Sequence, residues 1–364
     1  MKVGILTMHH SYNYGAAMQA VILANAISDL GHDVILVDLR GTYNKLYEDE
    51  AHQFIIKRRP PSVLNVHRRG YAEKERRFLE FFATATARTA LVESERDLDD
   101  IARDLDAVVV GSDEVWTLKF GFRAPYFLTF GPKDLGRISY AASVGRTTTF
   151  GTEASAIVAA LDAFDSVMVR DTTTQRLVAD ATGVTPPLTL DPVLLRLPKN
   201  QTSHDARVAS AQPIVLVYAE QHLTLRQVRA TRRVARRLGA RIVAVGYPHW
   251  FADENVIGAG PVEFLDLVAS SAVVVSPLFH GVVFAIALEK QLVILPSQKK
   301  RSKVMSLLEQ LDLTAIYGRL EMSSIDYDVV RRTLGDLREE SLRLLNTALN
   351  GVEQRRHGTA SEAT

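Results

Sequence analysis

The chain has 364 residues, of which 47% are hydrophobic and 23% charged, and its formal net charge is +1. This length and composition predict a globular protein with two domains, and the near-zero charge excludes a global field that would attract nucleic acid or an anionic membrane. The sequence has no cysteine, which excludes disulfides, thiol catalysis and cysteine-ligated metal sites.

The N-terminal segment 1–7 predicts a core strand rather than a signal peptide, because its apolar part is short and polar residues follow at once. No apolar run reaches the roughly 18 residues of a membrane span. We therefore expect a cytoplasmic protein that could contact a membrane only peripherally. Small polar residues close the chain, and we expect a frayed tail over 352–364.

Strand-like runs alternate with helix-like runs through most of the chain, which predicts α/β domains with parallel sheets. In the first half we expect strands at 3–7, 33–38, 107–110, 137–142 and 166–170. We expect helices there at 16–30, 76–85, 154–163 and 172–182. The polar, Lys- and Arg-rich stretch 41–75 has neither pattern and is interpreted as an excursion from the core.

A change of texture at 197–211, where polar residues dominate, predicts a linker. The alternation then begins again, with expected strands at 214–218, 241–246, 273–276 and 293–295 and helices at 225–238, 261–270 and 303–311. We predict an N-terminal lobe over 1–197, a C-terminal lobe over 212–328 and a long amphipathic helix over 329–351. Two Rossmann-like lobes joined in this way indicate an enzyme with a cleft between them.

The loop after the first strand carries many polar residues. Asn13 and Gly15 suit unusual backbone angles, and Gln19 would lie near the cleft. Capping of the following helix by Ser11 or Asn13 explains the same pattern without function. The neighbouring His9-His10 pair is not a metal pattern without a third ligand, and we predict no metal site.

The sequence Gly111 to Trp116 also follows a predicted strand. Ser112 and Asp113 can hydrogen-bond to hydroxyl groups, and Trp116 offers a flat apolar face of the kind that stacks on sugar rings. An ordinary helix N-cap at Ser112 or Asp113 remains the alternative. Ser143, in a run of small residues after another strand, would let a ligand come close, and tight packing explains it equally well.

Two residues at strand ends are candidates for chemistry. Arg170 can bind a carboxylate or phosphate in bidentate fashion, although a salt bridge to Asp171 is the alternative. His280 lies in a strand-to-helix crossover, where a histidine can hold or give a proton near neutral pH, and Gly281 beside it allows close approach of a ligand. A histidine satisfied by a backbone carbonyl is the other interpretation. Asp191, before a proline, is interpreted as a structural turn.

A basic cluster follows the strand at 293–295. It contains Lys300, Arg301 and Lys303 at the start of a predicted helix, where positive charge is unfavourable unless an anion offsets it. A solvated surface is the simpler interpretation. The sequence contains no GxSxG elbow, Walker loop, HExxH or GxGxxG motif.

Taken in order, these segments resemble the polysaccharide pyruvyl transferase family over nearly the whole chain. The matching segments are NYGAAMQA (13–20), GSDEVW (111–116), YFLTF (126–130), RISYAASVG (137–145), VMVRDTTT (167–174), LDPVLL (190–195) and EFLDLVASSAVVVSPLFHG (263–281). The resemblance implies a glycosyltransferase-B-like fold, in which we expect the long C-terminal helix to cross back to the first lobe.

The resemblance also implies an activity. Enzymes of this family move the enolpyruvyl unit of phosphoenolpyruvate, the donor substrate, onto two hydroxyls of a sugar and form a pyruvate ketal, so no cofactor is expected. The acceptor would be a polysaccharide or a lipid-linked glycan. His280 and Arg170 match the family's catalytic candidates. The expected donor-binding residues are Gly281, Lys300, Arg301, Lys303 and Ser143. The expected acceptor-binding residues are Asn13, Tyr14, Gly15, Gln19, Ser112, Asp113 and Trp116.

The chain departs from the family pattern at one position. Some members carry an arginine two positions before the histidine, where this chain has Leu278, so Lys300 or Arg301 would have to supply that anion contact. Two other functions therefore remain open. One is a glycosyltransferase that uses a nucleotide sugar and binds its ribose through an acid near Glu254 or Glu263. The other is a non-catalytic protein that binds carbohydrate or anions. The sequence does not determine the oligomeric state.

Overall fold

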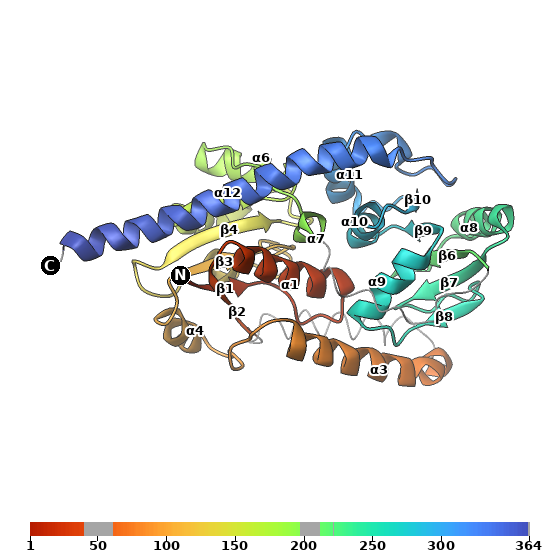
Figure 1. Ribbon diagram of the computed structural model, residues 1–364, viewed down its shortest axis with the longest axis horizontal. Coiled ribbons are helices and arrows are strands. Elements are labelled where there is room, and N and C mark those ends of the chain that lie inside the picture. Colours follow the sequence, from red (N-terminus) through yellow and green to blue (C-terminus); the bar gives the residue numbers. More distant parts are fainter. Residues whose placement is uncertain (40–60, 197–211, 221, 363–364) are drawn as a thin grey trace.

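The computed structural model describes residues 1–39, 61–196, 212–220 and 222–362 (Figure 1). The predicted linker at 197–211 and part of the polar stretch 41–75 lie outside the described residues. Within them the chain forms two α/β lobes, each built on a parallel five-stranded sheet.

The N-terminal lobe has the strand order β2-β1-β3-β4-β5. Its strands form from short apolar runs, and the run AVVV of β3 is fully buried because helices cover both faces of the sheet. The strands are β1 (Lys2–Leu6), β2 (Asp33–Leu36), β3 (Ala107–Val110), β4 (Gly136–Ala142) and β5 (Ser166–Val169). The helices are α1 (Tyr14–Asp29), α3 (Pro61–Ala85), α4 (Glu95–Ala102), α5 (Ala154–Leu161), α6 (Thr172–Thr182) and α7 (Pro192–Leu195).

The C-terminal lobe repeats the pattern with the order β10-β9-β6-β7-β8. Its helix α8 (Leu225–Leu238) begins at a capping box on Thr224 and ends at Gly239, which has the left-handed conformation that glycine adopts without strain. The strands are β6 (Ile214–Val217), β7 (Arg241–Val245), β8 (Glu254–Val256), β9 (Val273–Ser276) and β10 (Gln291–Ile294). The other helices are α9 (Pro261–Ser270), α10 (Phe279–Ala287) and α11 (Arg301–Gln310).

The strand order reverses once in each sheet, between β1 and β3 in the first lobe and between β6 and β9 in the second. Open α/β sheets bind ligands outside the carboxyl ends of their strands at such a reversal. The two reversal points face each other, because the start of α1, which follows β1, reaches the second lobe. A Cβ atom on Gly246, after β7, would meet Tyr14, and a Cβ atom on Gly15 would meet His280, which follows β9. The polar segments singled out in the sequence therefore converge between the lobes.

The long helix α12 (Tyr327–Glu362) crosses back from the second lobe to the first (Figure 1). It starts beside the C-terminal lobe, where Arg331 pairs with Glu289 at 3.0 Å. It ends on the N-terminal lobe, where Arg356 pairs with Asp106 at 2.9 Å. This confirms the expected crossing and, with the two parallel-sheet lobes, the glycosyltransferase-B-like fold class.

Helix α3 joins the lobes on the other side of the molecule (Figure 1). Arg77 of this helix pairs with Glu263 of α9 at 2.7 Å. Gly70 lies against Ile257, where a Cβ atom would approach the Ile257 side chain to 2.9 Å. Helices α12 and α3 therefore hold the two lobes together from two sides.

Some boundaries differ from the sequence prediction. The helix expected at 76–85 begins at Pro61, so the part of the polar stretch after residue 60 is helical rather than irregular. The prediction of a frayed tail at 352–364 is wrong for the residues up to Glu362. Helix α12 includes them, and its Val352 packs against Gly136 of β4. Helix α4 and strand β8 were not predicted. In the part of the chain that the structure describes, none of the helices has both the length and the hydropathy of a membrane span.

The crossing helix yields a test of stability. Leu345 of α12 is 0% exposed, whereas Val329 of the same helix is 44% exposed. Leu345→Ala should lower the free energy of unfolding by about 2–5 kcal/mol, because the lost side chain leaves a cavity under the helix. Val329→Ala should change it by about 0.5 kcal/mol or less. Urea unfolding followed by circular dichroism measures both, and equal effects would contradict the packing of α12 onto the lobes.

Candidate active site

His280 and Gly15 bring the two lobes into direct contact. His280 is the second residue of α10, which follows β9 directly, and its side chain is buried. Gly15 is the second residue of α1. A Cβ atom on Gly15 would lie 2.0 Å from both Cγ and Nδ1 of the His280 ring. Only glycine therefore permits this approach, and the structure brings together two residues that the sequence placed in different lobes.

Asp191 connects the two predicted catalytic residues. Nη1 of Arg170 donates to Oδ2 of Asp191 at 2.8 Å, and Nε2 of His280 lies 3.4 Å from the same oxygen. The other oxygen, Oδ1, caps the short helix α7 by accepting the N–H of Val193. Burial alone would raise the pKa of Asp191, but His280 and Arg170 hold it well below its ordinary value. The carboxylate is therefore ionised and holds both residues in place.

Sequence reasoning missed this role of Asp191, which was interpreted as a structural turn. It is a turn residue, since it caps α7, but its second oxygen is part of the site. One signal was present in the sequence: Arg170 ends a buried strand, and a buried arginine requires an acidic partner. The expected partner, Asp171, instead caps α6 through the N–H of Thr174.

Arg170 is enclosed by acids and one aromatic ring. Nη2 lies 3.4 Å from Oδ1 of Asp113, and Nη1 also donates to the hydroxyl of Ser112 at 3.4 Å. Cζ lies 4.5 Å from the centre of the Phe279 ring, a cation–π distance. Burial would lower the pKa of Arg170, but Asp191, Asp113 and Asp171 raise it overall. The guanidinium is therefore a fixed positive charge.

Two buried nitrogen atoms of this cluster have no hydrogen-bond partner of good geometry among the described residues: Nε of Arg170, and Nε2 of His280, which makes the 3.4 Å ion-pair contact with Asp191. About nine in ten buried polar groups in proteins have such a partner. Nε of Arg170 can only donate, so it suits an acceptor atom such as a carboxylate or phosphate oxygen. His280 can hold or release a proton beside it.

Another ion pair crosses between the lobes. Lys303 of α11 pairs with the half-buried carboxylate of Glu114, and its Nζ lies 5.7 Å from the centre of the Phe279 ring that Arg170 also faces. Burial would raise the pKa of Glu114, but Lys303 and Lys300 lower it to about 2. The structure therefore brings Lys303 to the site, as the sequence predicted, although it already has an acidic partner.

The other two cations of the basic cluster have different contacts. Nζ of Lys300 lies 3.7 Å from Oε1 of Glu220, and the guanidinium of Arg301 lies 5.9 Å from the centre of the Tyr317 ring. Neither has a described contact with Arg170 or His280. Their expected contact with a donor anion stays a prediction.

Two aromatic residues expected to bind an acceptor are packed in the core. Trp116 is 0% exposed and stacks on Phe127, with ring centres 5.5 Å apart. Tyr14 is also 0% exposed and stacks on Phe264 of the other lobe at 4.1 Å. Each donates its polar hydrogen to a backbone carbonyl oxygen. Their rings are therefore packed inside the core, and the expectation that they bind the acceptor stays a prediction.

Three other expected ligand contacts are internal supports. The side chain of Gln19 donates to Oγ1 of Thr7 and accepts the N–H of Ser112, whose own hydroxyl donates to a backbone carbonyl oxygen. The hydroxyl of Ser143 donates to Asp171 at 2.6 Å and is fully buried, and its expected role at the donor stays a prediction. These residues shape the loops that carry Asp113 and Arg170.

Asn13 and Gly281 also have structural roles. Asn13 caps α1 by accepting the N–H groups of Gly15 and Ala16, so the capping interpretation is confirmed. A Cβ atom on Gly281 would lie 2.1 Å from Oγ of Ser276, so this glycine allows α10 to pack on β9. Asp113 keeps a 16% exposed side chain, and it remains the candidate for acceptor hydroxyls with direct access.

A buried lysine lies near the site at the lobe interface. Lys74 of α3 is 5% exposed and has no acidic partner among the described residues. Its Nζ lies 4.6 Å from the ring centre of Tyr14, 5.2 Å from that of Tyr247 and 5.6 Å from that of Phe78. Burial lowers the pKa of Lys74 to about 7. The aromatic faces offset only part of the cost of burying the charge.

The fold and the buried Arg–Asp–His cluster define a two-lobed α/β protein with a candidate active site between its lobes. Residues 13–298, well over half of the chain, match the family model described as polysaccharide pyruvyl transferase. The chain belongs to the polysaccharide pyruvyl transferase family. A search of the curated proteins finds no match.

Solved structures with a similar fold include two epimerases and a transferase. UDP-N-acetylglucosamine 2-epimerase from Rickettsia bellii is 11% identical, with a TM-score of 0.49 over 97% of each chain. A putative UDP-N-acetylglucosamine 2-epimerase from Listeria monocytogenes is 12% identical, with a TM-score of 0.48 over 95% of this chain and 90% of that one. The spinosyn forosaminyltransferase SpnP is 14% identical, with a TM-score of 0.46 over 94% of each. No property of these proteins is transferred to this chain.

The lowered pKa of Lys74 predicts a pH-dependent stability. The unfolded chain binds this proton up to about pH 10.4, whereas the folded protein releases it near pH 7, so the free energy of unfolding should rise with pH between these values. Lys74→Met should therefore stabilise the protein by about 1–3 kcal/mol at pH 6, and this gain should shrink towards pH 10.

Urea unfolding at several pH values measures the effect. Lys133→Met, at an exposed lysine, is the matched control and should change stability by about 0.5 kcal/mol or less at every pH. A gain in the free energy of unfolding from Lys74→Met that is the same at all pH values would contradict the lowered pKa of Lys74.

Proposed function

We propose that the protein transfers the enolpyruvyl unit of phosphoenolpyruvate onto two hydroxyls of a sugar in a polysaccharide or glycolipid precursor. The observation that carries the proposal is the buried cluster in which Nε of Arg170 has no hydrogen-bond partner among the described residues and Nε2 of His280 lies 3.4 Å from Asp191. One is a permanent cation that suits the donor's carboxylate or phosphate, and the other is a group that can give a proton. Both are held by one carboxylate oxygen of Asp191.

The residues can be assigned to a balanced reaction. His280 gives a proton to the methylene carbon of the donor, which becomes a methyl group and leaves the central carbon electron-poor. The first sugar hydroxyl adds to that carbon and loses a proton. Phosphate departs with the electron pair of its C–O bond, and the second hydroxyl then adds and loses its proton. Of the two protons released, one leaves with phosphate and one returns to His280.

The charges around the cluster suit this chemistry. Arg170 provides fixed positive charge for the donor anion, and Lys303 adds a second cation beside the same aromatic ring. Leu278, which replaces an arginine of some family members, is 7% exposed and packs in the core, so it adds no polar contact. We propose that Lys303 rather than Lys300 or Arg301 offsets that missing arginine, because Lys303 alone among these three has a described contact next to Arg170.

A nucleotide-sugar transferase is less well supported. The two acids that would bind a ribose are already paired: Glu263 with Arg77 at 2.7 Å and Glu254 with Arg241 at 2.5 Å. Glu263 also accepts the N–H of Gly260 at the start of α9. Neither of the two carboxylates that a nucleotide-sugar transferase would use for the ribose, Glu254 and Glu263, is therefore free of an ion pair.

Phosphate release tests the proposal. The protein should release phosphate from phosphoenolpyruvate only when a suitable glycan is present, in a panel of acceptors with vicinal or 4,6-placed hydroxyls. Each acceptor should gain the mass of one pyruvate ketal. A protein that releases no phosphate with any acceptor, but turns over a nucleotide sugar in a parallel panel, would sink the proposal.

Variants assign the reaction to the cluster. His280→Gln should lower kcat by about 10²–10⁴-fold, the usual contribution of a general acid. Arg170→Lys keeps the charge but loses the planar guanidinium, and it should mainly raise KM for the donor. His357→Gln, at an exposed histidine, is the control for the first variant.

A pocket of about 600 Å³ on the second lobe provides the control variant for Arg170→Lys. It is lined by Arg226, Arg229, Arg233 and Arg319 and offers another place for an anion. Arg229→Gln should leave KM for phosphoenolpyruvate unchanged. A rise in KM for Arg229→Gln without one for Arg170→Lys would move the donor site away from the cluster.

The contact between Gly15 and His280 gives a separate test. Gly15→Ala puts a Cβ atom 2.0 Å from the His280 ring, so the ring has to leave its present position beside Asp191. We expect turnover to fall by about 100-fold or more, because a displacement of about 1 Å is enough for such a loss. Gly335→Ala in α12, where a Cβ atom meets nothing within 4 Å, is the control and should keep full turnover. Full turnover in Gly15→Ala would contradict the proposal that turnover depends on the position of the His280 ring.

A further inference from the structure

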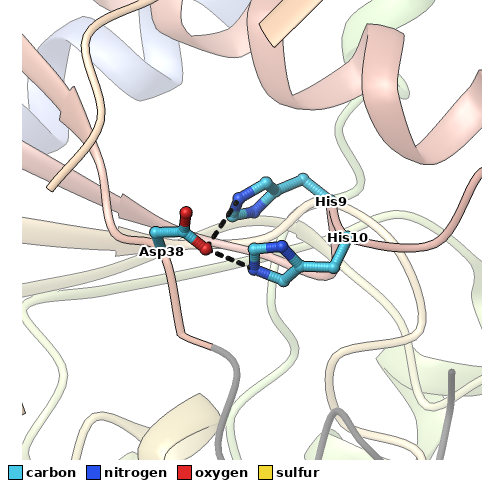
Figure 2. Close-up of side chains that lie close together, drawn as sticks. All are labelled: His9, His10 and Asp38. Carbon is cyan, nitrogen blue, oxygen red and sulfur yellow. Dashed lines mark ion pairs between the residues drawn. The ribbon is translucent and has the colours of Figure 1, made fainter. Parts of the chain in front are cut away.

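A cluster of two histidines and one aspartate lies at the carboxyl edge of the N-terminal sheet (Figure 2). His9 and His10 follow β1, and Asp38 follows the neighbouring parallel strand β2. One ligand atom from each residue lies within 4.8 Å of the other two. Nε2 of His10 is 3.2 Å and Nε2 of His9 is 3.9 Å from the same oxygen, Oδ1 of Asp38. The fold thus supplies the third ligand that the histidine pair lacks in the sequence.

The hydrogen bond of His9 determines which of its nitrogens carries a proton. Nδ1 of His9 lies 3.2 Å from the backbone carbonyl oxygen of Thr7, which can only accept, so Nδ1 carries the hydrogen. Nε2 then presents a lone pair. This atom is buried and has no hydrogen-bond partner among the described residues, and it faces a carboxylate oxygen. A positive charge between these two electron-rich atoms would stabilise the arrangement. A metal ion can supply that charge, because the Nε2 atom of a neutral imidazole is among the commonest metal ligands in proteins.

The surroundings hold the ligand atoms in place. Arg88 lies 3.7 Å from Oδ2 of Asp38, which leaves Oδ1 facing the histidines. The rings of His9 and Phe82 lie 5.4 Å apart, and the guanidinium of Arg88 lies 5.6 Å from the same Phe82 ring. The carbonyl of Thr7 contacts the far side of the His9 ring, and Arg88 pairs with the second oxygen of Asp38. Outer contacts of this kind orient the ligands of metal ions in proteins.

We propose that His9, His10 and Asp38 bind a divalent transition-metal ion of the zinc class. Two imidazoles and one carboxylate favour Zn²⁺, Co²⁺ or Ni²⁺ over Mg²⁺ and Ca²⁺, which prefer sites made only of oxygen. Three protein ligands leave a coordination position for water or a ligand. This site is separate from the Arg170–Asp191–His280 cluster and does not depend on the proposed transfer reaction.

The proposed ion would also order a loop that supports the candidate active site. Thr7, whose carbonyl holds His9, donates its hydroxyl to the carbonyl oxygen of Ser112 at 2.8 Å. Ser112 lies against Arg170. Metal bound at His9 should therefore raise the thermal stability of the N-terminal lobe, a readout that does not require turnover.

Metal titration of the full-length protein tests the proposal. After dialysis against a chelator, the wild type should bind one equivalent of Zn²⁺ by isothermal titration calorimetry. It should also develop the visible absorption of bound Co²⁺ and melt at a higher temperature with either ion. His10→Gln and Asp38→Asn should each weaken binding by about 100-fold or more, since changes to outer contacts alone cost about 10–100-fold.

The controls separate this cluster from other histidines and from misfolding. His357→Gln, at an exposed histidine on α12, should bind metal as the wild type does. Circular dichroism should show that His10→Gln, which removes only one ligand side chain, is folded. The proposal is overturned by a wild type that takes up no stoichiometric metal, by folded His10→Gln that binds as tightly as the wild type, or by loss of binding in His357→Gln.

Discussion

One carboxylate oxygen, Oδ2 of Asp191, holds the centre of this molecule together. It accepts a hydrogen bond from Arg170 of the first lobe and faces His280 of the second, and all three side chains are buried. Removing one partner from such a cluster leaves an uncompensated charge in the interior, which costs about 3–5 kcal/mol. The position of His280 relative to Arg170, and with it any chemistry between the lobes, depends on this carboxylate.

The rest of the interface keeps that geometry fixed. Helices α12 and α3 join the lobes on two sides, and the stacked pair Tyr14–Phe264 and the ion pair Lys303–Glu114 lie between them. These contacts combine apolar packing with paired charges, so the lobes are not simply tethered by a linker. The same packing buries the ring of Tyr14 in the interface between the lobes.

The loops of the N-terminal sheet form a connected support. Thr7 contacts Ser112 through its hydroxyl and His9 through its carbonyl, while Gln19 contacts both Thr7 and Ser112. Polar residues at this edge are thus used mostly to hold other polar residues, and few remain for direct contact with a ligand. Among the described residues, Asp113 keeps a partly exposed carboxylate, and Arg170 and His9 each keep a nitrogen atom without a hydrogen-bond partner.

The sequence by itself determined most of the elements and the family. Helix α8 ends at Leu238 and α6 at Thr182, as predicted, because a helix end depends on residues that are neighbours in the chain. The ordered motifs also pointed to His280 and Arg170. Only the tertiary structure decided that Asp191 joins them, that Trp116 is closed in the core, and that Asp38 meets a histidine pair 28 residues before it. Those contacts depend on which strands lie side by side and how the lobes pack, and no local pattern encodes either.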